Sequence, residues 1–159
     1  SPHHKADIQV LKDEPAMVDF LSKASIPGGM YMWPNCESNK EMNTEEFKAK
    51  VEKGPWGMLI VRGGKPNFGV NLTATFLWYV LISVLVAYIT SQARPAGATF
   101  GAVFQIATTA GVLGYAMGSF PNQLFFGIPN RFKITNLLDA ILYAIVTGLA
   151  FALLWPGIE

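Results

Sequence analysis

The stretch "NLLDAILYAIVTGLAFALLW", residues 136–155, is apolar almost throughout, yet it carries one carboxylate, Asp139. A helix needs about 20 residues to cross the hydrocarbon core of a bilayer, and this run has that length. A charged side chain at the bilayer centre costs about 2.5 kcal/mol or more, so Asp139 needs a partner or a function. The stretch therefore predicts a membrane helix that carries one polar site.

Two further apolar runs precede this one, and together they indicate a membrane protein. We predict three transmembrane helices, over about 70–90, 98–120 and 134–155. None of the three has the charged face that a surface helix of a soluble protein presents to water. The segments between them contain proline and glycine, which interrupt helices.

The charged residues are unevenly distributed along the 159-residue chain. Only 14% of the residues are charged, against about a quarter in an ordinary soluble domain. Past residue 67 the charged residues are Arg94, Arg131, Lys133, Asp139 and Glu159. We therefore predict a polar headpiece over residues 1–67 and a transmembrane helical domain over 68–159. The net charge of +1, without a basic run among aromatic residues, argues against a nucleic-acid partner.

The headpiece has the pattern of a small α+β unit. Asp13 precedes one run of helical apolar spacing, and Asn43 with Glu46 has the spacing of a capping box at the start of another. "GMYMW" and "GMLIVR" are typical of strands, and we expect their methionines in a strand core. A unit this short cannot bury enough apolar surface to form a large core. We therefore expect it to rest on the membrane face or on a partner. The fold class is thus membrane all-α with a small α+β headpiece.

Small residues recur every four positions in the second and third predicted helices. Such residues let membrane helices approach closely, so we expect these two helices to pack antiparallel. The first predicted helix is bulkier and is expected to face lipid or another subunit. The predicted packing residues are Ala110, Gly114 and Gly118 in the second helix, and Ala140, Ala144, Gly148 and Ala152 in the third.

Three interpretations of Asp139 remain open. It can pair as an ion with Arg131 or Lys133, which precede it near the same boundary. It can form a hydrogen bond with a polar group of the second helix, for which antiparallel packing favours Tyr115 or Ser119. It can also serve in proton or cation handling. We expect structural anchoring by one of the first two arrangements.

No catalytic, cofactor or metal site is predicted. His3 and His4 are adjacent, and neighbouring residues in regular structure do not readily direct both rings at one metal ion. Asp7 follows three residues after His4, which leaves open a site completed by another chain. A solvated terminus or tag is the simpler interpretation. Cys36 is the single cysteine, so an intrachain disulfide and a multi-cysteine zinc site are excluded.

Several phrases spread along the chain resemble a group of small, uncharacterised bacterial membrane proteins. They are "HHKADI", "IPGGMYMWP", "KGPWGMLIV", "LLDAILYAIVTG" and the closing "LWP". The resemblance implies the bacterial inner membrane and a further helix ahead of Ser1, which would make four spans. It implies no activity. Basic residues before the first helix and between the second and third place the headpiece in the cytoplasm by the positive-inside rule.

The expected function is therefore non-catalytic. We expect an accessory or structural subunit of a larger membrane complex, whose partners are the lipid bilayer and other membrane subunits or further copies of itself. The alternative is a homo-oligomer that handles protons or ions through Asp139.

Overall fold

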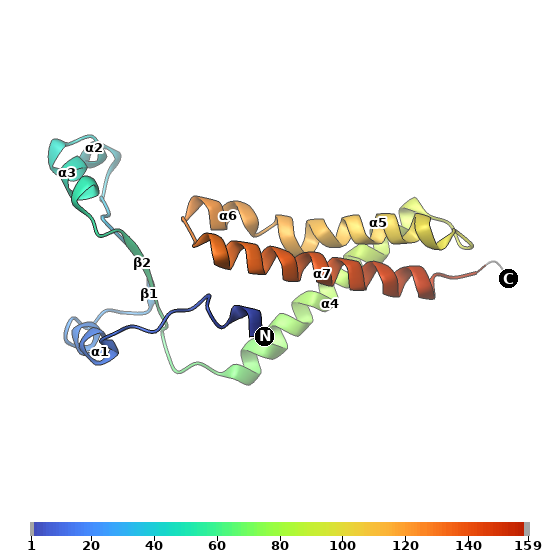
Figure 1. Ribbon diagram of the computed structural model, residues 1–159, viewed down its shortest axis with the longest axis horizontal. Coiled ribbons are helices and arrows are strands. Elements are labelled where there is room, and N and C mark those ends of the chain that lie inside the picture. The colour runs from blue at the N-terminus through green and yellow to red at the C-terminus, as the bar shows by residue number, and fades with distance from the viewer. Residues whose placement is uncertain (1, 158–159) are drawn as a thin grey trace. The chain divides into compact units, whose positions relative to one another are not determined.

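The computed structural model describes residues 2–157, and the chain divides into two compact units (Figure 1). The helical unit comprises the described residues up to Gln9 together with those from Gly69 onward. The second unit is Val10–Phe68. The first residues of the chain thus belong with the long helices, whereas the sequence alone grouped them with the headpiece.

Three helical stretches among residues 2–157 are long and apolar enough to cross a membrane, which confirms the predicted number and positions. They are Phe68–Ala93, Phe100–Phe125 and Asn130–Leu154. The first is helix α4 and the third is helix α7. The middle stretch is made of α5 (Phe100–Val112), a π-helical turn η2 (Leu113–Met117) and α6 (Phe120–Phe125).

The connection between the second and third long helices is shorter than the sequence indicated. Pro121 occupies the first turn of α6, where its missing N–H costs no hydrogen bond, and Gly127 turns the chain with φ +62°. Helix α7 then begins at Asn130, so Arg131 and Lys133 lie in its first turn rather than in a loop.

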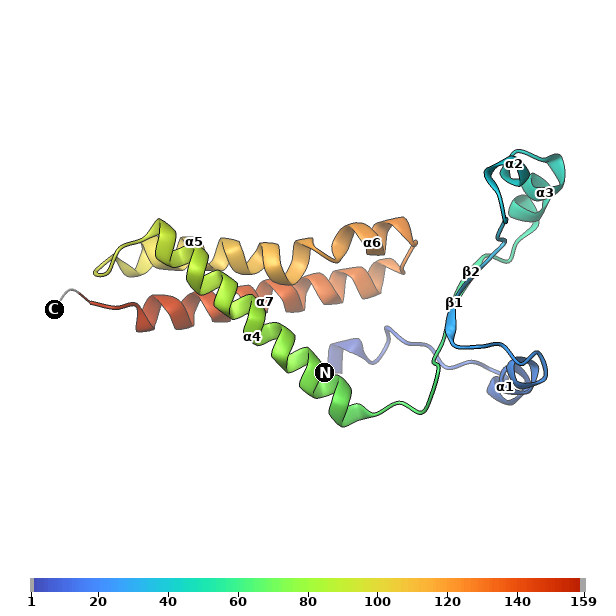
Figure 2. The ribbon, with the colours of Figure 1, turned by 180° about the vertical axis from the view of Figure 1, so that it is seen from behind.

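Helices α5 and α7 run antiparallel, side by side, and small residues form much of their contact (Figures 1 and 2). Gly111 lies against Ala144, where an added Cβ would come within 3.0 Å of the Ala144 Cα. Gly148 lies against Thr108, where an added Cβ would collide with Oγ1. Along α7, all four predicted packing residues, Ala140, Ala144, Gly148 and Ala152, are buried.

The predicted packing residues of the second helix lie differently. Ala110 clusters with Ile82 and Val86 of α4, and an added Cβ at Gly114 would meet the Ile82 side chain at 2.8 Å. Gly118 has no neighbour within 4 Å of such a Cβ. This stripe therefore faces α4 or open space, and the residues of α5 that approach α7 lie on an adjacent stripe, as Thr108 and Gly111 show.

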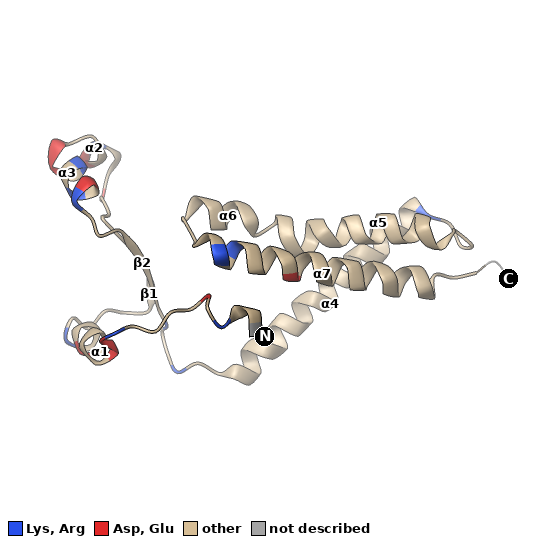
Figure 3. Cartoon of the chain, in the orientation of Figure 1, with Lys and Arg blue, Asp and Glu red and all other residues tan. Residues whose placement is uncertain are grey.

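Helix α4 crosses the α5–α7 pair at an angle and buries one narrow side (Figure 2). The buried positions are Ile82, Val86 and Thr90, four residues apart. Much of its length exposes bulky apolar side chains, as expected for a surface that faces lipid. Within the helical unit, Asp139 and the two basic residues at the start of α7 are the charges on the long helices (Figure 3).

The second unit is a two-stranded antiparallel ribbon with three short helices. Strands β1 (Gly29–Trp33) and β2 (Gly57–Val61) pair with Tyr31 opposite Leu59. Its helices are α1 (Glu14–Lys23), α2 (Asn39–Met42) and α3 (Glu45–Lys53).

Of the two helix N-caps predicted for this unit, one is confirmed and the other is wrong. Asp13 caps α1 by accepting from the backbone N–H of Ala16, as predicted. Thr44, not Asn43, caps α3, because its hydroxyl reaches the N–H of Phe47.

No residue of this second unit is buried. The expectation of a methionine-filled strand core is wrong, since Met30 and Met32 are 59% and 52% exposed. No residue of either strand is buried, so the two-stranded ribbon does not enclose a core.

Candidate functional site

The most concentrated group of titratable side chains lies where the start of the chain meets α7. Residues Pro2–His4 form one 3₁₀ turn, η1. Both histidine rings face the carboxylate of Asp139: His3 Nε2 lies 2.8 Å from Oδ1, and His4 Nε2 lies 2.8 Å from Oδ2. The two ring centroids are 4.4 Å apart. Adjacent histidines thus direct both rings at one group, because a single tight turn lets the rings lie side by side.

A second carboxylate, Asp7, supports the first contact. Its Oδ2 lies 2.6 Å from His4 Nδ1 and accepts a hydrogen bond of 2.6 Å from the Thr135 hydroxyl. Its Oδ1 lies 3.1 Å from Nε of Arg131, which also donates from Nη2 to the backbone carbonyl of His3. The Asp7 side chain is only 2% exposed. Asp7, His4 and Asp139 therefore form a continuous carboxylate–imidazole–carboxylate chain.

The contacts of Asp7 determine where the proton of His4 lies. Hydrogen bonds from Thr135 and His4, with the nearby charge of Arg131, lower the pKa of Asp7, so this carboxylate is ionised. An ionised carboxylate can only accept, so His4 must donate from Nδ1. In a neutral His4 the lone pair of Nε2 would then face Asp139 Oδ2, and two acceptors would oppose each other. Hydrogen bonds to Asp139 and Asp7 accordingly raise the pKa of His4. The geometry therefore calls for a cation, either a proton or a metal ion, between His4 and Asp139.

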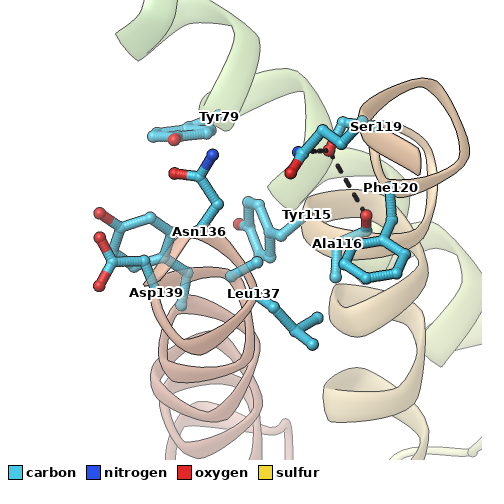
Figure 4. Close-up of a pocket in the computed structure, with 11 residues that line it drawn as sticks. Tyr79, Tyr115, Ala116, Ser119, Phe120, Asn136, Leu137 and Asp139 are labelled. Atoms are coloured by element: carbon cyan, nitrogen blue, oxygen red, sulfur yellow. Dashed lines mark hydrogen bonds between the residues drawn. The ribbon is translucent and has the colours of Figure 1, made fainter. Parts of the chain in front are cut away.

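Asp139 also lies on the wall of a cavity of about 230 Å³ (Figure 4). Tyrosines from three elements share this cavity: Tyr79 of α4, Tyr115 of η2 and Tyr143 of α7. Their rings contact one another, with centroids 5.7 to 6.1 Å apart. Asn136 extends toward the same space in Figure 4. The cavity is thus lined by hydroxyl and amide groups beside the carboxylate.

Polar contacts continue from this cavity along the bundle. The Tyr115 hydroxyl lies 3.4 Å from Ser83 Oγ and 3.3 Å from Thr147 Oγ1, which joins α4, η2 and α7. Thr147 is eight residues beyond Asp139, or about 12 Å along the helix axis. Tyr115 lies within the π-helical turn, an irregularity often found at functional sites. Hydrogen-bonding side chains therefore extend well along the three long helices.

The residues predicted to accompany Asp139 lie near it, but they do not make its hydrogen bonds. Arg131 pairs with Asp7 instead, and Lys133 lies half-buried in the same helical turn. Tyr115 and Ser119 line the cavity, where Ser119 accepts a hydrogen bond from Gln123 at 3.4 Å. His3 and His4, which sequence reasoning assigned to a solvated terminus, are the partners of the carboxylate.

The contact between His4 and Asp139 joins residues 135 positions apart, and no local sequence pattern predicts a contact over such a separation. One signal was available. Asp139 is an acid on an apolar helix, and a pair of histidines can supply the complementary positive charge. His3 and His4 are the two histidines of the sequence. Comparisons of the chain with protein-family models, with curated proteins and with solved structures find no match.

Proposed function

We propose that the chain is a multi-pass membrane protein that carries a cation, a proton or a metal ion, across the bilayer by way of Asp139, and that it catalyses no reaction on an organic substrate. The observation that carries this proposal is that Asp139, on a helix with the length and composition of a membrane span, is contacted by His4, which Asp7 contacts in turn. Ionisable residues inside membrane segments are costly and commonly mark ion or proton pathways.

The polar cavity beside Asp139 supports the same proposal. A cation that leaves the carboxylate would meet the tyrosine hydroxyls and the Asn136 amide rather than hydrocarbon. The hydroxyls of Ser83 and Thr147 lie beyond them. Such groups replace part of the hydration shell that a cation loses when it enters the bundle.

Reconstitution into liposomes tests this function directly. Proteoliposomes that contain a pH-sensitive dye, or a dye sensitive to divalent metal ions, should show uptake that the Asp139→Asn variant abolishes. The matched control is Asp19→Asn, which removes an exposed carboxylate paired with Lys23 in the other unit and should leave uptake unchanged. Size-exclusion chromatography in detergent checks that both variants fold. Wild-type liposomes no more permeable than empty ones would refute the proposal.

A second candidate is an accessory subunit of a larger membrane complex. It is favoured by α4, which leaves bulky side chains such as Trp78 and Tyr88 64% and 63% exposed. A neighbouring membrane subunit or a second copy of the chain could cover this surface as well as lipid can. Mild solubilisation of native membranes, followed by native gel electrophoresis, should then give a particle larger than the single chain.

The proposed location is the bacterial inner membrane, with Val10–Phe68 in the cytoplasm. The basic residues that support this orientation are Arg62 and Lys65 before α4 and Arg131 and Lys133 at the start of α7. Three crossings put both groups on one side of the bilayer and leave Arg94 on the other.

A further inference from the structure

We infer that His3, His4 and Asp139 form a binding site for one divalent metal ion of the zinc type. The inference deepens the proposed function by naming the chemical class of the cation that Asp139 holds. The site is reachable from water, because the His3 side chain is 48% exposed and those of His4 and Asp139 are 28% and 22% exposed.

The ligand atoms already lie near one another. One ring nitrogen of His3, one of His4 and a carboxylate oxygen of Asp139 all lie within 4.8 Å of one another. Nε2 of each ring is the nitrogen that lies 2.8 Å from an Asp139 oxygen. Zinc bonds to imidazole nitrogen and carboxylate oxygen measure about 2.0–2.2 Å, and ligand atoms of a tetrahedral site then lie about 3.4 Å apart. Small rotations of the two rings therefore bring three ligands to one ion, without movement of the helix.

The residues that contact His4 on the side away from Asp139 resemble those that orient a metal-bound histidine. A metal-bound histidine almost always donates its other ring N–H to a carboxylate or carbonyl, which fixes its orientation and raises its basicity. His4 Nδ1 meets Asp7 Oδ2 at 2.6 Å, and Thr135 and Arg131 hold Asp7 in turn. The ring nitrogen that remains, Nε2, is the one that faces Asp139. An ordinary surface ion pair between a histidine and an aspartate does not require this second carboxylate.

The donor set selects the class of metal. Two imidazoles and one carboxylate suit Zn²⁺, Co²⁺, Ni²⁺ or Cu²⁺, whereas Ca²⁺ and Mg²⁺ prefer oxygen ligands alone. Three protein ligands leave a fourth tetrahedral position for water or another small ligand. The two atoms that face each other there, His4 Nε2 and Asp139 Oδ2, are both of types that bind zinc, so one ion can bind both.

Co²⁺ is the probe we choose, because it substitutes for Zn²⁺ and absorbs visible light in a tetrahedral site. The full chain is purified in detergent with no polyhistidine tag and titrated with Co²⁺, followed by competition with Zn²⁺. We expect one ion per chain, intense visible absorption bands, and loss of both in His4→Gln and Asp139→Asn. In Asp7→Asn the affinity should fall by about 10- to 100-fold, the usual effect of removing a carboxylate that orients a metal-bound histidine.

Two control variants separate this site from other metal ligands. Cys36→Ser removes the only thiol, and Asp19→Asn removes a carboxylate in the other unit, so both should bind Co²⁺ as the wild type does. Circular dichroism in detergent confirms that each variant keeps its helices. The inference is overturned if the folded wild type binds no stoichiometric Co²⁺ or Zn²⁺, or if binding survives His4→Gln and is lost in Cys36→Ser.

The liposome experiment and this titration fail independently. Metal binding without cation uptake would refute the proposed function and leave the metal site in place. Uptake of protons by a chain that binds no metal would refute the metal site and leave the function in place.

Discussion

At the scale of single residues, the carboxylate of Asp139 has its partners within the same chain. Two imidazoles from the start of the chain face its two oxygens, and a second acid, Asp7, orients one of those imidazoles. The charged groups near the start of α7 thus contact one another in a row: Arg131 contacts Asp7, Asp7 contacts His4, and His4 contacts Asp139. Each of these four side chains contacts a group of opposite charge or a hydrogen-bond donor, so none of the four is an isolated charge.

This arrangement predicts how the first residues of the chain attach to α7. Asp7→Asn removes the negative charge that Arg131 and His4 face, so residues 3–9 should leave α7 more often. Hydrogen–deuterium exchange of peptides from this segment, measured by mass spectrometry in detergent, should become several-fold faster. Exchange across Phe100–Val112 should not change, and equal exchange of residues 3–9 in both proteins would contradict the prediction.

At the scale of helices, the α5–α7 contact depends on residues without a large side chain. Gly148 and Gly111 allow one backbone to approach the side chains or backbone of the other. Membrane helices gain no hydrophobic driving force from each other in lipid, so this close approach supplies much of their attraction through van der Waals contact. Helix α4 has fewer such positions, and its attachment depends on Ile82, Val86 and the contacts of Tyr79 and Tyr115.

A pair of glycine substitutions tests this account. The Cβ of Gly148→Ala would lie 3.1 Å from the Thr108 Cβ and closer still to its hydroxyl, so the helices must separate slightly. We expect a loss of about 1–3 kcal/mol, typical of overpacking. Gly118→Ala meets nothing within 4 Å and should be neutral or slightly stabilising. Thermal unfolding in detergent compares the two variants, and equal midpoints would contradict the close-packing account.

At the scale of the whole molecule, the chain joins a helical unit of membrane-spanning composition to a unit without a core. The single cysteine, Cys36, lies half-buried in the second unit and therefore reports the side of the membrane on which that unit lies.

With Val10–Phe68 in the cytoplasm, a membrane-impermeant maleimide should label Cys36 in inverted vesicles and leave it unlabelled in intact cells. The comparison variant carries Ala98→Cys in a Cys36→Ser background, because Ala98 lies between α4 and α5 at the opposite ends of the spans. Its labelling should show the reverse pattern. Labelling of Cys36 in intact cells would instead place the second unit outside.

The parts of this structure that the sequence predicted are those in which the signal is local. The apolar length of each long helix, the Asp13 cap and the two short strands are all encoded in short stretches of residues. The attachment of His3 and His4 to Asp139 is not local, because it depends on which surfaces meet after the helices pack. The small-residue stripe of α7 coincides with its buried positions. The pattern could not assign Ala110 and Gly114 to α4, since Gly and Ala stripes look alike whichever neighbour they face.

The attachment of residues 3–9 to α7 has a consequence for everything between Val10 and Phe68. The residues on both sides of that segment belong to the helical unit, so the segment forms a loop whose two ends are fixed. The entropy of closing such a loop changes only slowly with its length. A flexible linker in its place would leave both anchoring points where they are. A change in the length of this insert therefore costs little in loop-closure entropy, while the residues around Asp139 remain assembled.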